Sequence, residues 1–196
     1  MASPVKINFK MYQGSTFREV LRWESSTKVY APITAISKSA PVTVTAPNHG
    51  CPVGWRARVV GAGGMKEINI ATENYALVTD ALVDQVTFNS INSLNYTQYT
   101  SGGVLEYNQP VALAGYSARM QLRSKISSPE VLLELTTENG GIEIDENLST
   151  ITLISQPAQT ALLSFDMAVY SLELVAGQEV VPFSVGNISL IKEITR

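Results

Sequence analysis

The sequence predicts an all-β protein: an antiparallel β-sandwich with one short helix and an inserted small β-barrel module. Three observations lead to this fold class. Apolar and polar residues alternate with a period of two along most of the chain, which is the pattern of half-buried strands. Turn-forming Gly, Asn, Asp and Pro residues separate these runs at short intervals, as they do in sandwiches and barrels. The middle of the chain differs in composition from both ends, which indicates an insertion.

The N-terminal portion contains two predicted strands. They cover residues 7–11 and 16–24, and Gly14 marks the turn between them. In the second strand Phe17 and Trp23 stand at odd-numbered positions, together with Leu21, so all three point to the same face. An apolar face of this kind is expected to pack on another layer of the protein, so we assign these strands to the sandwich.

From about residue 33 to residue 103 charged side chains become sparse, and Gly, Thr, Asn and Ser predominate. The strands predicted in this range are short and cover residues 42–44, 55–59, 75–79 and 85–88. An exposed hairpin tolerates a compact guest module when the two ends of the guest lie close together. We therefore predict a discontinuous β-sandwich docking domain, formed by residues 1–32 and 104–196, and an inserted β-barrel module formed by residues 33–103.

The alternation is clearest in residues 116–123. Tyr116, Ala118, Met120 and Leu122 point one way, and the polar residues between them point the other way. Further strands of this kind are predicted at 131–135, 142–145, 150–153, 170–174 and 188–190. The segment 155–163 breaks the pattern, and Pro157 stands where the first turn of a helix tolerates a missing N–H group. We predict a short helical crossover there.

Composition excludes several classes of function. Charged residues make up only 16% of the chain and the net charge is −3. Because no run of Lys or Arg exists that would neutralise many phosphates, we expect no nucleic-acid partner. No apolar stretch approaches the roughly 20 residues that a spanning helix needs, so we expect no membrane partner. Residues 1–10 lack the apolar centre of a signal peptide, which predicts assembly in a host cytoplasm.

The chain has one cysteine, Cys51, and one histidine, His49. A nucleophilic pair of these residues would need an orienting carboxylate, and none lies nearby in the sequence. A zinc site would need three or four ligands, which leaves only a metal shared between subunits. The carboxylates of 143–146 lack the regular oxygen spacing of a calcium loop, and the Gly-rich loop 61–64 is not followed by Lys-Ser or Lys-Thr. We expect no catalytic residue, no cofactor and no metal.

Aromatic and apolar residues supply candidate interface positions instead. Tyr96, Tyr99 and Tyr107 could stack on a ligand, but we expect them to cover the core or to meet a neighbouring subunit. The strands 104–107 and 180–185 are expected to be exposed and to pair with a neighbour's sheet edge. The predicted interface residues are Tyr96, Tyr99, Tyr107, Val104, Val181 and Phe183.

Three stretches of the outer portion carry a resemblance to a known family. The segments 109–123, 135–142 and 169–174 resemble a β-sandwich found in tailed-phage virion proteins, such as the N-terminal domains of upper-baseplate and fibre-adaptor proteins. The segment 194–196 resembles the usual end of such a domain. In that family the strand before the Gly-Tyr pair follows directly on a Gly-Ser-Thr-Phe type strand. Here the matching segment 14–17 is separated from it by the inserted module.

The inserted portion carries a second resemblance. The segments 46–54, 63–69 and 99–103 are similar to a module of phage proteins that shares the fold of the first catalytic-cysteine half-domain of ubiquitin-activating enzymes. This resemblance implies a small β-barrel. It implies no active cysteine, since the position of Cys51 is commonly apolar in such modules and no nucleotide-binding domain accompanies it.

Together the resemblances imply a non-enzymatic bacteriophage virion structural protein that mediates subunit assembly. A tail, baseplate or fibre-attachment adaptor is the leading expectation, and a capsid-surface decoration or cement protein is the alternative. A module that binds host-surface carbohydrate is a third possibility, which would need a concave aromatic site with converging polar groups. The expected partners are other virion proteins and copies of the chain itself.

Overall fold

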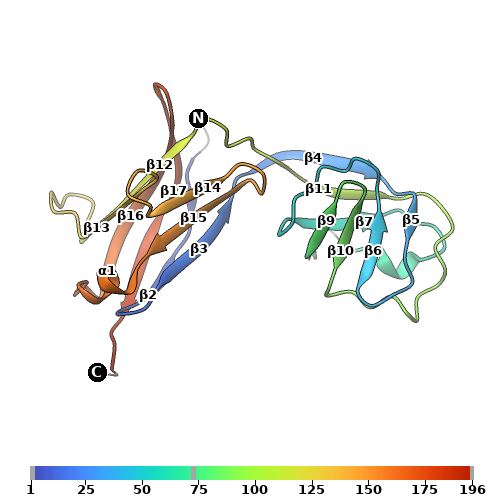
Figure 1. Ribbon diagram of the computed structural model, residues 1–196, viewed down its shortest axis with the longest axis horizontal. Coiled ribbons are helices and arrows are strands. Elements are labelled where there is room, and N and C mark those ends of the chain that lie inside the picture. The colour runs from blue at the N-terminus through green and yellow to red at the C-terminus, as the bar shows by residue number, and fades with distance from the viewer. Residues whose placement is uncertain (1–2, 72–73, 195–196) are drawn as a thin grey trace. The chain divides into compact units, whose positions relative to one another are not determined.

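The computed structural model describes residues 3–71 and 74–194, and these residues form a mostly β structure (Figure 1). The predicted all-β class is therefore confirmed. The elements in chain order are β1 (Val5–Lys6), β2 (Phe9–Tyr12), β3 (Phe17–Arg22), β4 (Glu24–Pro32), β5 (Ala35–Ile36), β6 (Val42–Thr45), β7 (Arg56–Val60), the 3₁₀ helix η1 (Lys66–Ile68), β8 (Ala76–Leu77), β9 (Asp80–Leu82), β10 (Gln85–Phe88), β11 (Val104–Pro110), β12 (Ser117–Arg123), β13 (Leu133–Thr136), β14 (Ile142–Asp145), β15 (Thr150–Ser155), α1 (Pro157–Ala161), β16 (Met167–Ala176) and β17 (Glu179–Ile191). Within the described residues, no helix is long and apolar enough to cross a membrane.

Contacts between residues divide the chain into two compact units. Unit 1 consists of Met1–Arg22, Ala112–Glu146 and Thr150–Arg196, and unit 2 consists of Trp23–Val111 with Asn147–Ser149. Unit 2 is wider than the 33–103 module of the sequence analysis because it includes β4 and β11. These two strands pair with each other along most of their length, so they form part of the same sheet.

Unit 1 is a β-sandwich of two sheets. The larger sheet has the strand order β1-β17-β16-β12-β13, with β2 also paired to β17, and the smaller sheet has the order β14-β15-β3. Strand β12 shows the expected alternation: Ala118, Met120 and Leu122 are buried, and the residues between them are more exposed. All strand pairs are antiparallel except that β1 and β2 run parallel to β17. The parallel pairs join the two ends of the chain in one sheet.

The crossover helix of unit 1 is shorter than the predicted segment 155–163. It covers only Pro157–Ala161, since Ser155 still pairs with β3 at the end of β15. The side chain of Gln159 accepts a hydrogen bond from the backbone N–H of Gln156, which fixes the start of the helix. The sequence resemblance noted for 194–196 involves Thr195 and Arg196, which lie outside the described residues.

Unit 2 consists of two four-stranded sheets around one core. Their strand orders are β5-β6-β10-β9 and β4-β11-β7-β8. The core contains Trp55, Phe88, Met65 and Leu105, all of which are fully buried. No strand pair of the described residues links the two sheets, so the predicted small β-barrel is not closed. The sequence pattern could not settle this point, because strands of a barrel and of two packed sheets show the same alternation.

Candidate functional site

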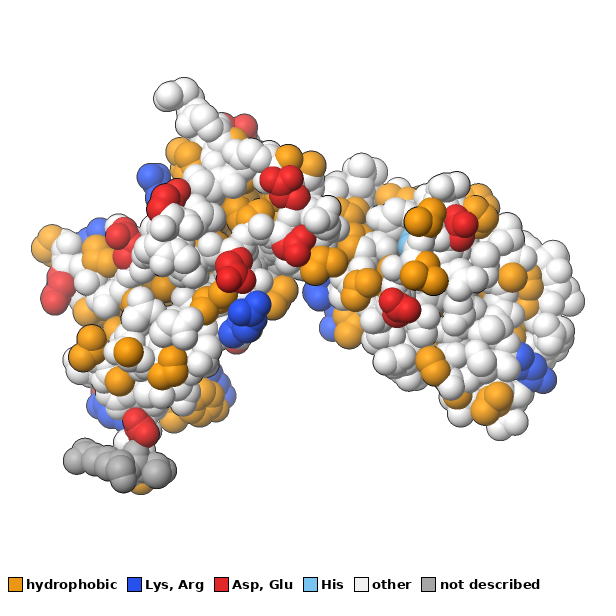
Figure 2. All heavy atoms as spheres, viewed as in Figure 1, with side chains coloured by type: hydrophobic (Ala, Val, Ile, Leu, Met, Phe, Trp, Pro, Cys, Tyr) orange, Lys and Arg blue, Asp and Glu red, His pale blue; other side chains and the backbone are white. Residues whose placement is uncertain are grey.

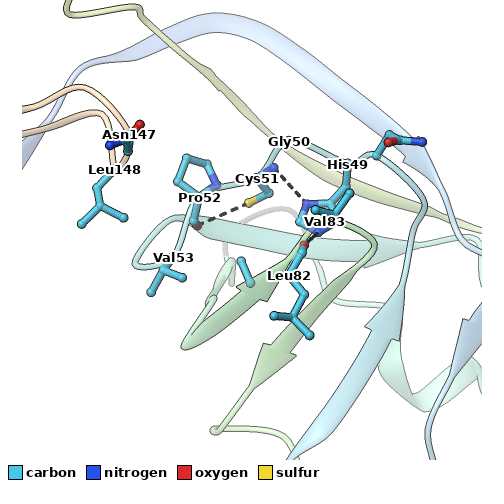
Figure 3. A pocket seen from close by; sticks show the side chains of 11 residues that line it. His49, Gly50, Cys51, Pro52, Val53, Leu82, Val83, Asn147 and Leu148 are labelled. Atoms are coloured by element: carbon cyan, nitrogen blue, oxygen red, sulfur yellow. Dashed lines mark hydrogen bonds between the residues drawn. The ribbon is translucent and has the colours of Figure 1, made fainter.

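His49 and Cys51 lie close together in the turn-containing loop between β6 and β7 of unit 2 (Figure 3). The backbone N–H of Cys51 donates to Nδ1 of His49 at 2.9 Å, and Nε2 of His49 lies 2.8 Å from the carbonyl oxygen of Leu82. Because Nδ1 accepts a hydrogen bond, the ring proton is assigned to Nε2, which donates to the carbonyl oxygen of Leu82. The hydroxyl of Tyr107 donates to the carbonyl of His49. The imidazole therefore ties this turn to the hairpin of β9 and β10.

The thiol of Cys51 is poorly placed for chemistry. The side chain is only 3% exposed, and burial, with a smaller contribution from the negative charge of Glu24, raises the pKa of the thiol to about 12. The thiolate is the nucleophilic form of cysteine, and at neutral pH this group is almost entirely a thiol. The neighbouring imidazole nitrogen of His49 already accepts the backbone N–H, so it is not free to act as a base toward the sulfur.

Carboxylates considered as metal ligands are dispersed or paired. Glu143 lies on β14, and one of its oxygens is 3.7 Å from the guanidinium of Arg18. Residues 3–71 and 74–194 contain no group of three His, Cys, Asp or Glu side chains that could hold a metal ion.

The predicted edge pairing of 104–107 is wrong. Strand β11 lies between β4 and β7 and pairs with both, so it has no free edge there. Tyr107 is a core residue that is 2% exposed, and Val104 is half-buried. The sequence predicted a strand here, but a local sequence does not distinguish a central strand, which is paired on both sides, from an edge strand.

The other predicted interface residues differ in their settings. Tyr96 and Tyr99 are partly buried against the core of unit 2, and the hydroxyl of Tyr99 lies within hydrogen-bond distance of the carbonyl of Ile33. The three tyrosines are therefore mainly packing residues of unit 2. Val181 and Phe183 are half-buried on β17, where the segment pairs with β16. Their role at an interface stays a prediction.

A buried ionic network that the sequence analysis missed lies on unit 2. The carboxylate of Glu106 on β11 is 2.8 Å from the guanidinium of Arg58 on β7 and 3.8 Å from the ammonium of Lys28 on β4. The hydroxyl of Tyr75 donates to the same carboxylate and accepts a hydrogen bond from Lys28 at 2.8 Å. Only the register of the three strands brings these groups together, because they are separated by dozens of positions in the sequence.

The balance of forces on Glu106 favours its charged form. Burial alone raises the pKa of this carboxyl, but hydrogen bonds from Arg58 and Tyr75, with the charges of Arg58 and Lys28, outweigh burial and hold the pKa below its ordinary value. The partners that the structure shows for the Glu106 carboxylate are Arg58 and Lys28, which lie on the same sheet, and Tyr75. The network therefore acts as a structural clamp that holds the segment before β8 against β7, β11 and β4.

The larger sheet of unit 1 carries a second feature that the sequence analysis missed. Its outer face contains a hollow with a volume of about 490 Å³. The side chains that shape this hollow come mainly from β12, β16, β17 and the loop after β12, and they are Gln121, Arg123, Ile126, Val169, Val185 and Asn187. We call this feature the outer-face hollow. The sequence did contain a signal for this hollow. Val169 and Val185 are apolar, although the alternation along their strands places them on the side that faces solvent.

The surface in general carries few charges. On the face shown in Figure 2, single acidic and basic side chains are scattered among polar ones, and apolar side chains appear in small groups. This agrees with the low charged fraction of 16%. Single exposed apolar residues are normal on soluble proteins, whereas an apolar hollow between outward-facing strands calls for an explanation.

Comparison with known protein families finds no match for this chain, and no curated protein is significantly similar to it.

Proposed function

We propose that this chain is a non-enzymatic structural protein of a bacteriophage particle, and that it works by protein–protein contact. The observation that carries the proposal is the outer-face hollow, an apolar depression on the solvent side of the larger sheet of unit 1. Apolar depressions of this kind are typical of surfaces that a partner covers. The virion placement, and the adaptor position at the tail, baseplate or fibre attachment, are supported only by the sequence resemblances described above.

The setting of the chain's one cysteine and one histidine supports a role without chemistry. Both ring nitrogens of His49 form hydrogen bonds with backbone groups, and Cys51 is a buried thiol. A residue pair used in this way contributes to the stability of a turn and leaves no activated nucleophile. The function of the protein therefore lies in the contacts that its surfaces make with other proteins.

Immunogold labelling of purified phage particles with an antibody against the full chain tests the proposal. An adaptor is expected to label one end of the tail, and a decoration protein would label the capsid shell instead. The control is the same antibody on particles from a phage in which the gene is disrupted. Absence of the protein from intact particles would refute the virion role.

The enzyme alternative is tested with a single substitution. Cys51→Ala removes the thiol but leaves the backbone N–H that His49 accepts, so the turn can persist. We expect particle assembly and infectivity to be unchanged in this variant. A loss of infectivity in particles that contain a normal amount of the protein would support a chemical role for the thiol.

A further inference from the structure

We infer that the outer-face hollow binds an apolar side chain that belongs to an acidic segment of a partner protein. This inference deepens the proposed function, since it assumes that the outer face of the larger sheet is a docking surface. It adds the chemistry of the partner, which neither the sequence nor the resemblances supply. Four features of the hollow carry it: a floor fixed by strand register, a braced wall, an apolar lining and basic residues in and next to it.

The floor of the hollow is fixed by strand register. Gln121 on β12 lies opposite Ser171 on β16, which in turn lies opposite Val185 on β17. In the next outward-facing row, Arg123 lies opposite Val169, which in turn lies opposite Asn187. Residues paired in this way point to the same face of a sheet, so the two rows form one continuous surface. Strand β16 is central in the sheet, so the surface is held by strand pairing on both of its sides.

The wall of the hollow is formed by the loop after β12. The guanidinium of Arg123 donates to the carbonyl of Ser128 at 2.7 Å and to the carbonyl of Pro129 at 2.8 Å. It also donates to the side-chain oxygen of Gln121 at 2.7 Å. These hydrogen bonds hold the loop beside the sheet face, and the loop presents Ile126 with 90% of its surface exposed. An isoleucine so exposed beside a braced hollow is suited to contact with an apolar partner group.

The lining of the hollow is suited to an apolar ligand. Val169 and Val185 form its apolar floor, Ile126 stands at its edge, and the polar groups Gln121 and Asn187 lie beside them. Its volume of about 490 Å³ lies within the range of roughly 300–1,000 Å³ that is usual for ligand sites. A site with an apolar floor and a few polar groups at its margin holds one large side chain and the peptide backbone next to it.

Basic residues lie in and next to the hollow, with Arg123 in its lining and two lysines near it in sequence or register. Lys6 on β1 is the register partner of Val185, and Lys125 directly precedes Ile126. Within residues 3–71 and 74–194, neither lysine forms an ion pair, and Arg123 is the charged side chain that lines the hollow itself. One carboxylate lies next to the hollow: Glu134, which accepts a hydrogen bond from Gln121 at 2.6 Å. The whole chain has a net charge of −3, so this local excess of positive charge is not a general property of the surface. Charge complementarity therefore predicts carboxylates beside the apolar group of the partner.

The inference is tested by selecting short linear peptides from a random yeast-displayed library on the full-length protein. We expect the recovered peptides to carry Asp or Glu within two positions of a Leu, Ile or Phe residue. Binding of the selected peptides is then measured against variants. Ile126→Asp is expected to weaken binding at least tenfold, and the double variant Lys6→Glu/Lys125→Glu is expected to weaken it several-fold. Both variants alter exposed side chains, so both are expected to fold.

Two matched variants serve as controls. Ile194→Asp makes the same apolar-to-acidic change at a residue of unit 1 that is 95% exposed and does not line the hollow. Lys66→Glu makes the same charge reversal on the exposed surface of unit 2. Neither is expected to change peptide binding by more than twofold. Backbone amide shifts of Val169 and Asn187 in a titration of the labelled full chain are expected to report binding at the hollow.

Three results would overturn the inference. These are the recovery of no peptide that depends on Ile126, a set of recovered peptides without acidic residues, and self-association of the protein that Ile126→Asp abolishes. The third result would identify a second copy as the occupant. The proposed function fails separately: a protein that binds acidic peptides at the hollow but is missing from particles refutes the virion role alone. A protein that is present on particles but fails the peptide tests refutes this inference alone.

Discussion

Replacing Glu106 by alanine tests whether the ionic network of unit 2 stabilises the fold. The side chain of Glu106 is only 6% exposed, and it is the acceptor that Arg58, Tyr75 and Lys28 share. Glu106→Ala removes this acceptor and leaves two cations beside each other without their counter-charge. We therefore expect a loss of stability that is larger than for an ordinary surface ion pair.

The magnitude follows from the burial of the remaining partners. Removing one member of a fully buried ion pair costs about 3–5 kcal/mol, because the other charge stays buried and unpaired. The side chains of Arg58 and Lys28 keep 14% and 34% of their surface exposed, so water can reach both cations after the change. We expect Glu106→Ala to lower the free energy of unfolding of unit 2 by about 2 kcal/mol. Glu106→Gln keeps an acceptor oxygen and should cost about 1 kcal/mol.

Tryptophan fluorescence is a selective assay for this effect. The chain contains two tryptophans, Trp23 and Trp55, and both belong to unit 2. Trp55 is fully buried, and its indole N–H donates to the carbonyl of Asn108 at 2.7 Å. Its emission is expected to shift when unit 2 unfolds in urea. The midpoint of this transition should fall in Glu106→Ala with an unchanged slope.

The matched control is Glu173→Ala in unit 1. Glu173 pairs with Arg119 at 2.7 Å, but the two side chains keep 32% and 56% of their surface exposed, and pairs that water can reach contribute about 0–1 kcal/mol. Glu173→Ala should leave the fluorescence transition of unit 2 unchanged. If Glu106→Ala shifts this transition no further than Glu173→Ala does, the network does not stabilise unit 2 and the reasoning from burial is wrong.

The same network predicts a dependence of stability on pH. The pKa of Glu106 is lower in the folded protein than the ordinary value of 4.5. A carboxyl with a lowered folded pKa contributes its full stabilisation above its unfolded pKa and loses it as the pH falls through the folded pKa. Unit 2 should therefore lose stability below about pH 4.5, and Glu106→Gln should lose less over the same range. An equal acid sensitivity in both proteins would contradict this prediction.

Three further predictions concern single residues. Cys51 should not react with iodoacetamide at pH 7–8 unless the protein is unfolded, because burial raises the pKa of its thiol to about 12. Mass spectrometry measures the labelling, and fast labelling of the native protein would contradict this prediction. Gly186→Ala should disrupt unit 1, because a Cβ there would clash with the backbone oxygen of Ile7. Gly140→Ala should cost only about 1 kcal/mol, because the space around Gly140 is open and only its φ of 72° is unfavourable for alanine. Thermal unfolding followed by circular dichroism compares the two variants, and equal losses of stability would contradict the clash. Asn139→Ala should cost about 1–2 kcal/mol of stability and increase aggregation of the native protein, because the Asn139 carboxamide hydrogen-bonds backbone groups on the edge of β13. Unfolding in urea measures the loss of stability, and light scattering measures the aggregation. Wild-type behaviour in both assays would show that this edge needs no cap.

Much of the local structure could be predicted from the sequence, because the side-chain period of a strand is a local property. The alternation in 116–123 predicted β12 within one residue, and the break in alternation after residue 154 predicted α1, although the helix is shorter than expected. The turns also followed from local chemistry. Gly14, predicted at the turn between the first two strands, has a positive φ of 73°.

The candidate site could be predicted only in part. The sequence shows that His49 and Cys51 are two positions apart, so the hydrogen bond between them is local, but the bond of His49 to Leu82 depends on the position of the β9–β10 hairpin. The outer-face hollow was missed because β12 and the loop after it lie far in the sequence from the β16–β17 hairpin with which they form the hollow. Val169 and Val185 become neighbours only through the pairing of β16 with β17.

The sequence by itself determined that this protein is all-β, that it contains a compositionally distinct middle portion, and that it has a single cysteine and a single histidine. Only the tertiary structure decided that β11 is a central strand, that Glu106 is clamped between two cations, and that an apolar hollow opens on the outer face of unit 1. The physical reason is that alternation fixes which residues share a face. Whether a face is covered, and which strands lie side by side on it, depends on pairings between distant segments.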